Sequence, residues 1–399
     1  TFPSVAAAWR ISQEAFMDGT KNWLDDLKIR ASWGQTGSAT GLGLYPSYTL
    51  ISTGGLILNN TYQQIATLKT IGNQDLTWEH TDMLNFGLDV KLLNSRLNFT
   101  GEYYVKNTKD ILLEMPVPLE YGFGKPNMNI GQVRNKGWEL SVSWNDRIND
   151  FGYSISGNLS DNRNEVIDLG GTGPWKGSNT YTDVGLPFNS IYGYESMGLF
   201  QSDEEVANAP FQNSNTGAGD VRYKNQNGDD KIDANDRVVL GDPNPHFLYG
   251  LNLGLDYKSF DLNMFFQGIG QKDRVILDQF VRPFFDSTIF EHQLDYWSPE
   301  NTNAKYPRIL NKDDGTHNYQ QSDYWMINAG YLRMKNLQIG YTIPRELLRS
   351  AGFDRIRLYF SANNLFTISD FVPGMDPESA SAGAYPFART YSFGLNVQF

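Results

Sequence analysis

A strict alternation of apolar and polar residues limits what this chain can fold into, and its C-terminal stretch shows the pattern clearly. Tyr391, Phe393, Leu395, Val397 and Phe399 are apolar, and each residue between them is small or polar. A period of two is that of a β-strand with one apolar and one polar face. An exposed strand with such an apolar row promotes aggregation unless something covers it. Lipid is one such cover.

The same alternation recurs in ten further stretches, at 2–11, 27–34, 84–90, 97–106, 138–145, 153–160, 247–257, 260–266, 337–343 and 355–362. Both a soluble sandwich and a membrane barrel produce this pattern, so alternation alone leaves both open. Aromatic residues bracket several apolar rows, as Trp138 and Trp144 do in one and Tyr249 and Tyr257 in another. Rings near both ends of a strand favour two membrane–water interfaces.

The links between the stretches favour the membrane barrel. Short links at 92–95, 146–150 and 258–259 alternate with long ones at 35–76, 113–132, 164–246, 271–329 and 367–388. Residues 344–352 form a link of middle length that predicts one helical turn, with Pro at its start and Gly at its end. Short turns on one rim and long loops on the other are typical of outer-membrane barrels. The sequence therefore predicts an all-β fold, a transmembrane antiparallel β-barrel of about eleven strands with long extracellular loops.

Composition agrees with this fold class. Mean hydropathy is only −0.46 although 14% of the residues are aromatic, as expected when half of every strand faces water. No run of 18 apolar residues predicts a transmembrane helix. The net charge of −12 argues against nucleic acid as a partner, and the absence of Cys excludes disulfides. The first residues show no signal-peptide pattern, so we expect a mature or truncated chain, and an odd strand count beginning on the long-loop side leads us to expect the C-terminal half of a larger barrel.

Several segments resemble the SusC/RagA family of TonB-dependent transporters. They are 2–12, 23–37, 127–131, 135–139, the Asp-rich stretch near 229, 241–245 and 362–366. The resemblance implies a barrel of roughly 22 strands with a plugged lumen, in a Bacteroidetes-type outer membrane. Residues 1–399 are then its C-terminal part, with the plug domain and the N-terminal strands absent from this chain.

The same resemblance implies a function and partners. Such transporters import oligosaccharides or peptides, driven by TonB through the plug region, and a SusD-like lipoprotein caps the mouth. Oligosaccharide import is the first expectation, and peptide import is the alternative. A barrel that only binds glycans or adheres to surfaces is a further alternative. The remainder of the transporter would close the barrel in lipid. Tyr391, Phe393 and Phe399 resemble the C-terminal assembly signal of such barrels.

An Asp-rich segment approximates a calcium-binding loop. Side-chain oxygens would come from Asn225, Asn227, Asp229, Asp233 and Asp236, and a backbone carbonyl from Lys231. The segment departs from the pattern, because Asp230 stands where Gly is expected and the last ligand is Asp rather than Glu. The sequence predicts a structural Ca²⁺ site here, with a solvated acidic turn as the alternative.

Aromatic residues in the long links are candidates for contact with substrate or a partner, because sugar rings and peptides dock on aromatic faces. They are Trp175, Tyr181, Tyr192, Phe284, Phe285, Trp297, Tyr324 and Trp325. Packing within the loops is the alternative for each. The four His residues are scattered and no catalytic motif is present, so the sequence predicts no enzyme and no further cofactor.

Overall fold

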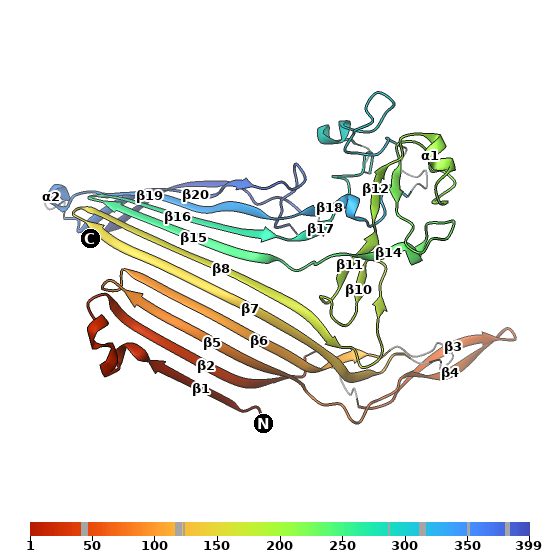
Figure 1. Cartoon of the computed structure of the whole chain (residues 1–399), viewed down its shortest axis with the longest axis horizontal. Helices are drawn as coiled ribbons and strands as arrows, with labels where there is room; N and C mark the ends of the chain where they lie inside the picture. Colours follow the sequence, from red (N-terminus) through yellow and green to blue (C-terminus); the bar gives the residue numbers. More distant parts are fainter. Residues whose placement is uncertain are drawn as a thin grey trace.

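Eleven strands form one antiparallel sheet in chain order (Figure 1). The computed structural model describes residues 1–40, 47–115, 122, 124–285, 288–310, 317–348, 352–379 and 384–399. The strands are β1 (Ser4–Arg10), β2 (Leu24–Ser38), β5 (Glu79–Leu92), β6 (Leu97–Glu114), β7 (Asn127–Ile148), β8 (Phe151–Asp168), β15 (His246–Tyr257), β16 (Phe260–Gln271), β19 (Tyr331–Thr342), β20 (Arg355–Ile368) and β21 (Thr390–Gln398). Each contains or overlaps one predicted stretch, so the predicted strands are confirmed.

The register brings the apolar residues of neighbouring strands into continuous rows. Leu253 of β15 lies opposite Ile155 of β8 and Met264 of β16, and the row continues through further apolar residues to Tyr391 of β21. Ile155 and Tyr391 are 44% and 55% exposed, so the described residues leave the face open at both positions. Lipid is the environment that such a face requires.

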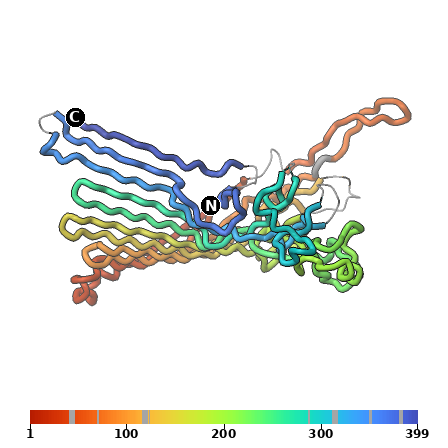
Figure 2. Tube along the Cα trace, turned by 90° about the horizontal axis from the view of Figure 1, so that it is seen from above, coloured from red at the N-terminus to blue at the C-terminus, as the bar shows by residue number. Residues whose placement is uncertain are grey.

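The opposite face is polar. Asn252 of β15 lies opposite Ser156 of β8, which in turn lies opposite Ser143 of β7. Phe265 of β16 interrupts this polar row, which resumes at Asn336 of β19. Figure 2 shows that the sheet is bent, so that β20 and β21 rise away from the plane of the first strands. A bent sheet with one polar face is the wall of a barrel with an aqueous lumen.

Three central strands are longer than the sequence predicted. β6, β7 and β8 contain 18, 22 and 18 residues, whereas about 9–11 residues cross a bilayer. Alternation predicted only 138–145 of β7, because polar residues such as Asn129, Gln132 and Arg134 dominate its first half. The strand is longer than the bilayer requires, so that half needs no apolar row facing lipid.

The short-turn rim matches the expectation. Asn149 and Lys258, in the turns after β7 and β15, have φ of 54° and 53°, in the left-handed region that tight hairpin turns use. The predicted helical turn is present as α2 (Arg345–Leu348), and Gly352 follows it with a φ of 76°. The helices η1 (Ile11–Gln13) and η2 (Ala15–Thr20) join β1 to β2 on the same rim (Figure 1).

The long links contain structure that the alternation did not predict. Link 164–246 folds into β9 (Trp175–Lys176), β10 (Thr180–Thr182), β11 (Ser190–Tyr194), β12 (Ser196–Leu199), α1 (Asp203–Ala207), β13 (Val221–Tyr223), η4 (Ala234–Asp236) and β14 (Arg237–Gly241). Link 271–329 contains β17 (Asp273–Val275), η5 (Glu291–Leu294), η6 (Asp323–Trp325) and β18 (Met326–Asn328). Link 35–76 forms a projecting hairpin of β3 (Leu50–Leu58) and β4 (Thr61–Thr70) (Figure 1). Most of these elements are too short for a period to stand out.

Within the described ranges, no helix has both the length and the apolar character needed to cross a membrane.

A charge on the apolar face tests the assignment of the two faces. Val142→Arg places a cation in the row that faces lipid, which costs about 2–4 kcal/mol near the bilayer midplane. We expect much less folded protein in purified membranes, measured as the heat-modifiable band on a denaturing gel. Ser141→Arg on the polar face is the matched control and should fold at close to the wild-type level. Equal losses in both variants would contradict the assignment.

Candidate functional site

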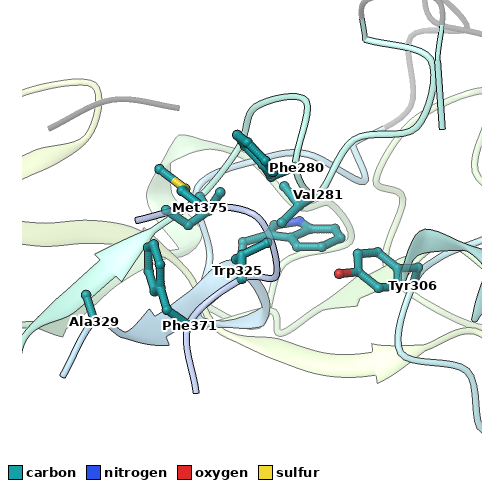
Figure 3. Packing of buried hydrophobic residues seen from close by; sticks show 9 residues of the cluster. Phe280, Val281, Tyr306, Trp325, Ala329, Phe371 and Met375 are labelled. Carbon is teal, nitrogen blue, oxygen red and sulfur yellow. The ribbon is translucent and has the colours of Figure 1, made fainter. Parts of the chain in front are cut away.

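The long links 164–246, 271–329 and 367–388 pack together at the loop end of the sheet (Figure 1). Trp325, which is only 3% exposed, lies among Phe280, Val281 and Met375 (Figure 3). Phe371, from link 367–388, completes this cluster. Burying several aromatic side chains gives these loops an apolar core of their own, so they form one body.

A second cluster lies within link 164–246. Tyr194, Val221, Tyr223 and Ile232 are buried together, and the rings of Tyr194 and Tyr223 are 5.1 Å apart. Tyr324 packs against both this cluster and the one around Trp325. The two clusters are therefore joined through one side chain.

A buried carboxylate crosslinks two of the links. Asp220 accepts hydrogen bonds from Nε and Nη2 of Arg308, both at 2.8 Å, and from Nδ2 of Asn318 at 2.8 Å. Asn318 in turn accepts a bond from the backbone N–H of Val221 at 2.8 Å. The side chain of Asp220 is 3% exposed, so its charge needs these partners. This network holds link 164–246 against link 271–329.

A second ionic network ties link 367–388 to the sheet. Arg333 of β19 is 2% exposed and donates to Asp376 at 2.6 Å, to Glu378 at 3.0 Å and to Thr367 at 2.9 Å. Lys335 also pairs with Glu378, at 2.9 Å. Burial of Asp376 favours its neutral form, but the hydrogen bond and charge of Arg333 and the backbone N–H groups of Glu378 and Phe387 together outweigh this and keep the pKa of Asp376 below its ordinary value.

His246 joins the end of link 164–246 to the barrel wall. Its Nδ1 lies 2.6 Å from Asp161 of β8, and its Nε2 lies 3.2 Å from Asp242. Asp242 also accepts a bond from the backbone N–H of Asn244 at 2.9 Å. The segment 241–245, which carried part of the family resemblance, thus forms the junction between link 164–246 and β15.

Three of the eight aromatic residues predicted to contact substrate are buried inside this loop body. Tyr192, Trp297 and Trp325 are buried, at 7%, 8% and 3% exposure. The indole N–H of Trp325 donates to the carbonyl of Asn318 at 2.6 Å, and that of Trp297 to Gln201 at 3.2 Å. In this structure these three side chains support the loops from within.

The other five predicted aromatics are less buried. Tyr181 stacks on Tyr192 with the ring centroids 5.1 Å apart, and Trp175 donates to Thr172 at 3.0 Å. The hydroxyl of Tyr324 donates to the carbonyl of Lys305 at 2.8 Å. Phe284 is 38% exposed, whereas Phe285 is half-buried beneath the guanidinium of Arg282. Contact of these rings with substrate stays a prediction.

The Asp-rich segment is organised by its own backbone. Both carboxylate oxygens of the fully buried Asp236 accept amide N–H groups, from Gln226 at 2.9 Å and from Asp233 at 2.8 Å. Asp229 accepts from the N–H of Lys231 at 3.0 Å, and the Lys231 ammonium pairs with Asp233 at 2.6 Å. Asn225 accepts from Gly228 at 2.6 Å, and Asn227 accepts from Asp229 at 2.9 Å.

Calcium binding at this segment stays a prediction. Among the described residues, no group of three or more His, Cys, Asp or Glu side chains is arranged to hold a metal ion. The Asn oxygens and the Lys231 carbonyl of the predicted loop fall outside that set of residue types.

The predicted assembly residues Tyr391 and Phe393 lie on the edge strand β21, and Phe399 directly follows it. Tyr391, Phe393 and Phe399 are 55%, 85% and 83% exposed. The rings of Phe393 and Phe360 are 5.2 Å apart, as are those of Phe399 and Phe353. Their role in assembly stays a prediction.

Removing the Asp220 carboxylate should loosen the loop body. Asp220→Ala leaves the Arg308 guanidinium and the Asn318 amide without their shared acceptor, at a cost of about 1.5–3 kcal/mol. We expect limited proteolysis within links 164–246 and 271–329 to become roughly 10- to 100-fold faster. Glu204→Ala, on the exposed face of α1, is the control and should leave the cleavage rate unchanged. An unchanged rate in Asp220→Ala would show that the network does not hold the two links together.

Calorimetry tests the calcium prediction. Titrating Ca²⁺ into the intact protein should release or absorb heat at one site, and Asp229→Asn combined with Asp233→Asn should abolish that heat. Asp203→Asn combined with Glu204→Gln removes the same charge from α1 and should leave it unchanged. Absence of heat with the unaltered protein would refute the site.

Comparison with known proteins places this architecture in a family. The sequence-family model described as "TonB dependent receptor-like, beta-barrel" matches residues 1–365. TonB-dependent receptor P26 of Formosa agariphila is 32% identical over 424 residues, covering 100% of this chain and 42% of the relative. TonB-dependent receptor SusC of Bacteroides thetaiotaomicron is 29% identical over 424 residues, covering 100% of this chain and 40% of the relative. The chain thus spans about two fifths of the length of these relatives.

Solved structures show the same architecture. The RagAB peptide transporter superposes with a TM-score of 0.81 at 25% identity, over 100% of this chain and 43% of the other. The RagAB peptide importer in its "open-open" state gives 0.82 at 25% identity, over 100% and 42%. These likenesses confirm the predicted all-β barrel fold and the outer-membrane location. The chain belongs to the β-barrel family of TonB-dependent receptors of the bacterial outer membrane, and within it to the SusC/RagA type.

Proposed function

We propose that the protein containing this chain imports oligosaccharides across the outer membrane, driven by TonB. The observation that carries the proposal is the eleven-stranded sheet with one lipid face and one polar face, in a chain of the SusC/RagA type. Such a sheet encloses an aqueous path, and the family supplies the coupling to TonB.

The polar face suits a hydroxyl-rich substrate. A hollow of about 220 Å³ on β6, β7, β8 and β15 is lined mainly by small polar side chains, among them Asn98, Thr100, Ser143 and Asn158. Hydroxyls and amides both donate and accept hydrogen bonds, as sugar hydroxyls do.

Several charges on this face are paired with one another. Arg30 pairs with Asp89 at 3.1 Å and with Glu102 at 2.5 Å, and Lys109 pairs with Asp82 at 2.8 Å. Pairing lowers the field that these charges exert on a passing substrate.

Further strands are needed to complete the wall. In the described sheet β1 and β21 are the edges, and each pairs with one neighbour. Unpaired backbone groups are costly in lipid, so we propose that the plug-bearing remainder of the transporter supplies strands to both edges. We further propose a SusD-like lipoprotein at the mouth, because the RagAB structures pair a SusC-type barrel with a second protein.

Oligopeptides are the second candidate substrate. The observation that favours them is the likeness to RagAB, which is described as a peptide transporter. In this case too the substrate enters through the loop body and follows the polar face.

Uptake by whole cells tests the proposal. Cells that carry the receptor should take up a fluorescently labelled oligosaccharide pool at least tenfold faster than cells lacking it, and a protonophore should abolish the difference. A labelled tryptic peptide pool should enter both strains at one rate. Receptor-dependent uptake of peptides alone would establish the second candidate. If uptake of both pools is the same with and without the receptor, and with and without the protonophore, import by this receptor is refuted.

A further inference from the structure

A cavity of about 480 Å³ lies where β19 begins and β20 ends, against link 367–388. Arg333 of β19 and Asn364 and Thr367 of β20 form part of its wall. Asp376, Phe387 and Arg389 of the link form another part. Its volume lies within the range of small-ligand sites, and it is large enough for the end of an oligomeric substrate.

The charges that line this cavity do not cancel. Arg333 is offset by Asp376, which pairs with it at 2.6 Å. Arg389 adds one more cation to the lining, and within the described ranges it takes part in no ion pair. The cavity therefore holds one positive charge in excess, in a chain whose net charge is −12.

Hydrogen bonds order the backbone next to Arg389. Asn364 donates through Nδ2 to the carbonyl of Ala388 at 3.1 Å, which fixes the backbone next to Arg389. Asp376 accepts the backbone N–H of Phe387 at 3.2 Å, and the ring of Phe387 lies 5.2 Å from the Arg333 guanidinium. A ligand group therefore meets a site whose backbone is already ordered, which lowers the entropy cost of binding.

The remaining donors are suited to an anion. A guanidinium presents a planar fork of N–H groups that matches the oxygens of a carboxylate or a sulfate. The Thr367 hydroxyl accepts from Arg333, so its own hydrogen is available to a ligand oxygen. Phe387 and neighbouring prolines give the cavity apolar walls for the ring or chain that carries the anion.

We infer that this cavity binds an anionic end group of the substrate, a carboxylate or a sulfate, with Arg389 as the cation that selects it. The inference rests on the proposed import function and narrows its substrate class. An acidic sugar and a peptide with a free C-terminus both carry this group. The receptor should therefore prefer the acid form of its substrate over the neutral form, whether that substrate is an oligosaccharide or a peptide.

Equilibrium binding to the full-length receptor in detergent tests the inference. The probes are two fluorescent pairs, trigalacturonate with its methyl ester and tetra-alanine with its C-terminal amide. Each pair differs only in the anionic groups. We expect the unaltered receptor to bind the acid of one pair at least tenfold more tightly than its neutral form, as a charge-assisted hydrogen bond provides.

Variants assign that preference to one residue. Arg389→Gln should bring the acid down to the affinity of the neutral probe, and Arg389→Lys should retain part of the preference. Arg345→Gln is the matched control, because Arg345 is exposed on α2 at the opposite end of the sheet (Figure 1). It should bind all probes as the unaltered receptor does.

Two results would overturn the inference. One is equal affinity for acid and neutral forms in both pairs, and the other is a preference that survives Arg389→Gln. Neither depends on energised uptake, so loss of the binding preference and loss of import are separate outcomes. Import without the preference would leave the proposed function standing and remove only the anion site.

Discussion

Pairing of the backbone in lipid is the constraint on which the structure depends. A strand inside a bilayer has no water to satisfy its N–H and C=O groups, so a neighbouring strand must satisfy them. The eleven strands do this by pairing in chain order, each antiparallel to the next. The strict side-chain alternation follows, because a slip of one residue in register would turn a polar row into the lipid. Rows such as the one through Ile155, Leu253 and Met264 are the result.

Outside the membrane a different set of forces holds the chain. Water satisfies the backbone there, so the loops keep their shape through an aromatic core around Trp325 and through buried ion pairs. A buried pair is costly to break from one side, because the remaining charge is left without a partner. Asp220 and Arg333 therefore specify how the loops lie on one another and on the sheet. Such fixed loops give a mouth of defined shape above the polar face.

The membrane-spanning part of the structure can be predicted from the sequence. Alternation identified every strand of the large sheet, and link lengths identified the two rims, because both follow from local patterns. Alternation did not reveal the first half of β7, where the strand exceeds the length that crosses a bilayer and needs no row facing lipid. The partners of Asp220 and Arg333 were also hidden, since Asn318 and Glu378 lie 98 and 45 residues away in the chain. Aromatic residues in the links were predicted to contact substrate or a partner, but sequence alone does not separate Trp325, which is buried, from Phe284, which is exposed.

Spin labels along β15 in the full-length receptor, reconstituted in lipid, test the central claim most directly. Labels at Leu251, Asn252, Leu253, Gly254 and Leu255 sample both faces of one strand. The account predicts high collision rates with oxygen, which concentrates in lipid, at the three Leu positions, and low rates at Asn252 and Gly254. A water-soluble nickel reagent should favour Asn252 and Gly254 over the Leu positions. Uniform accessibility along the strand, or the opposite phase, would contradict a barrel wall with its apolar face in the bilayer.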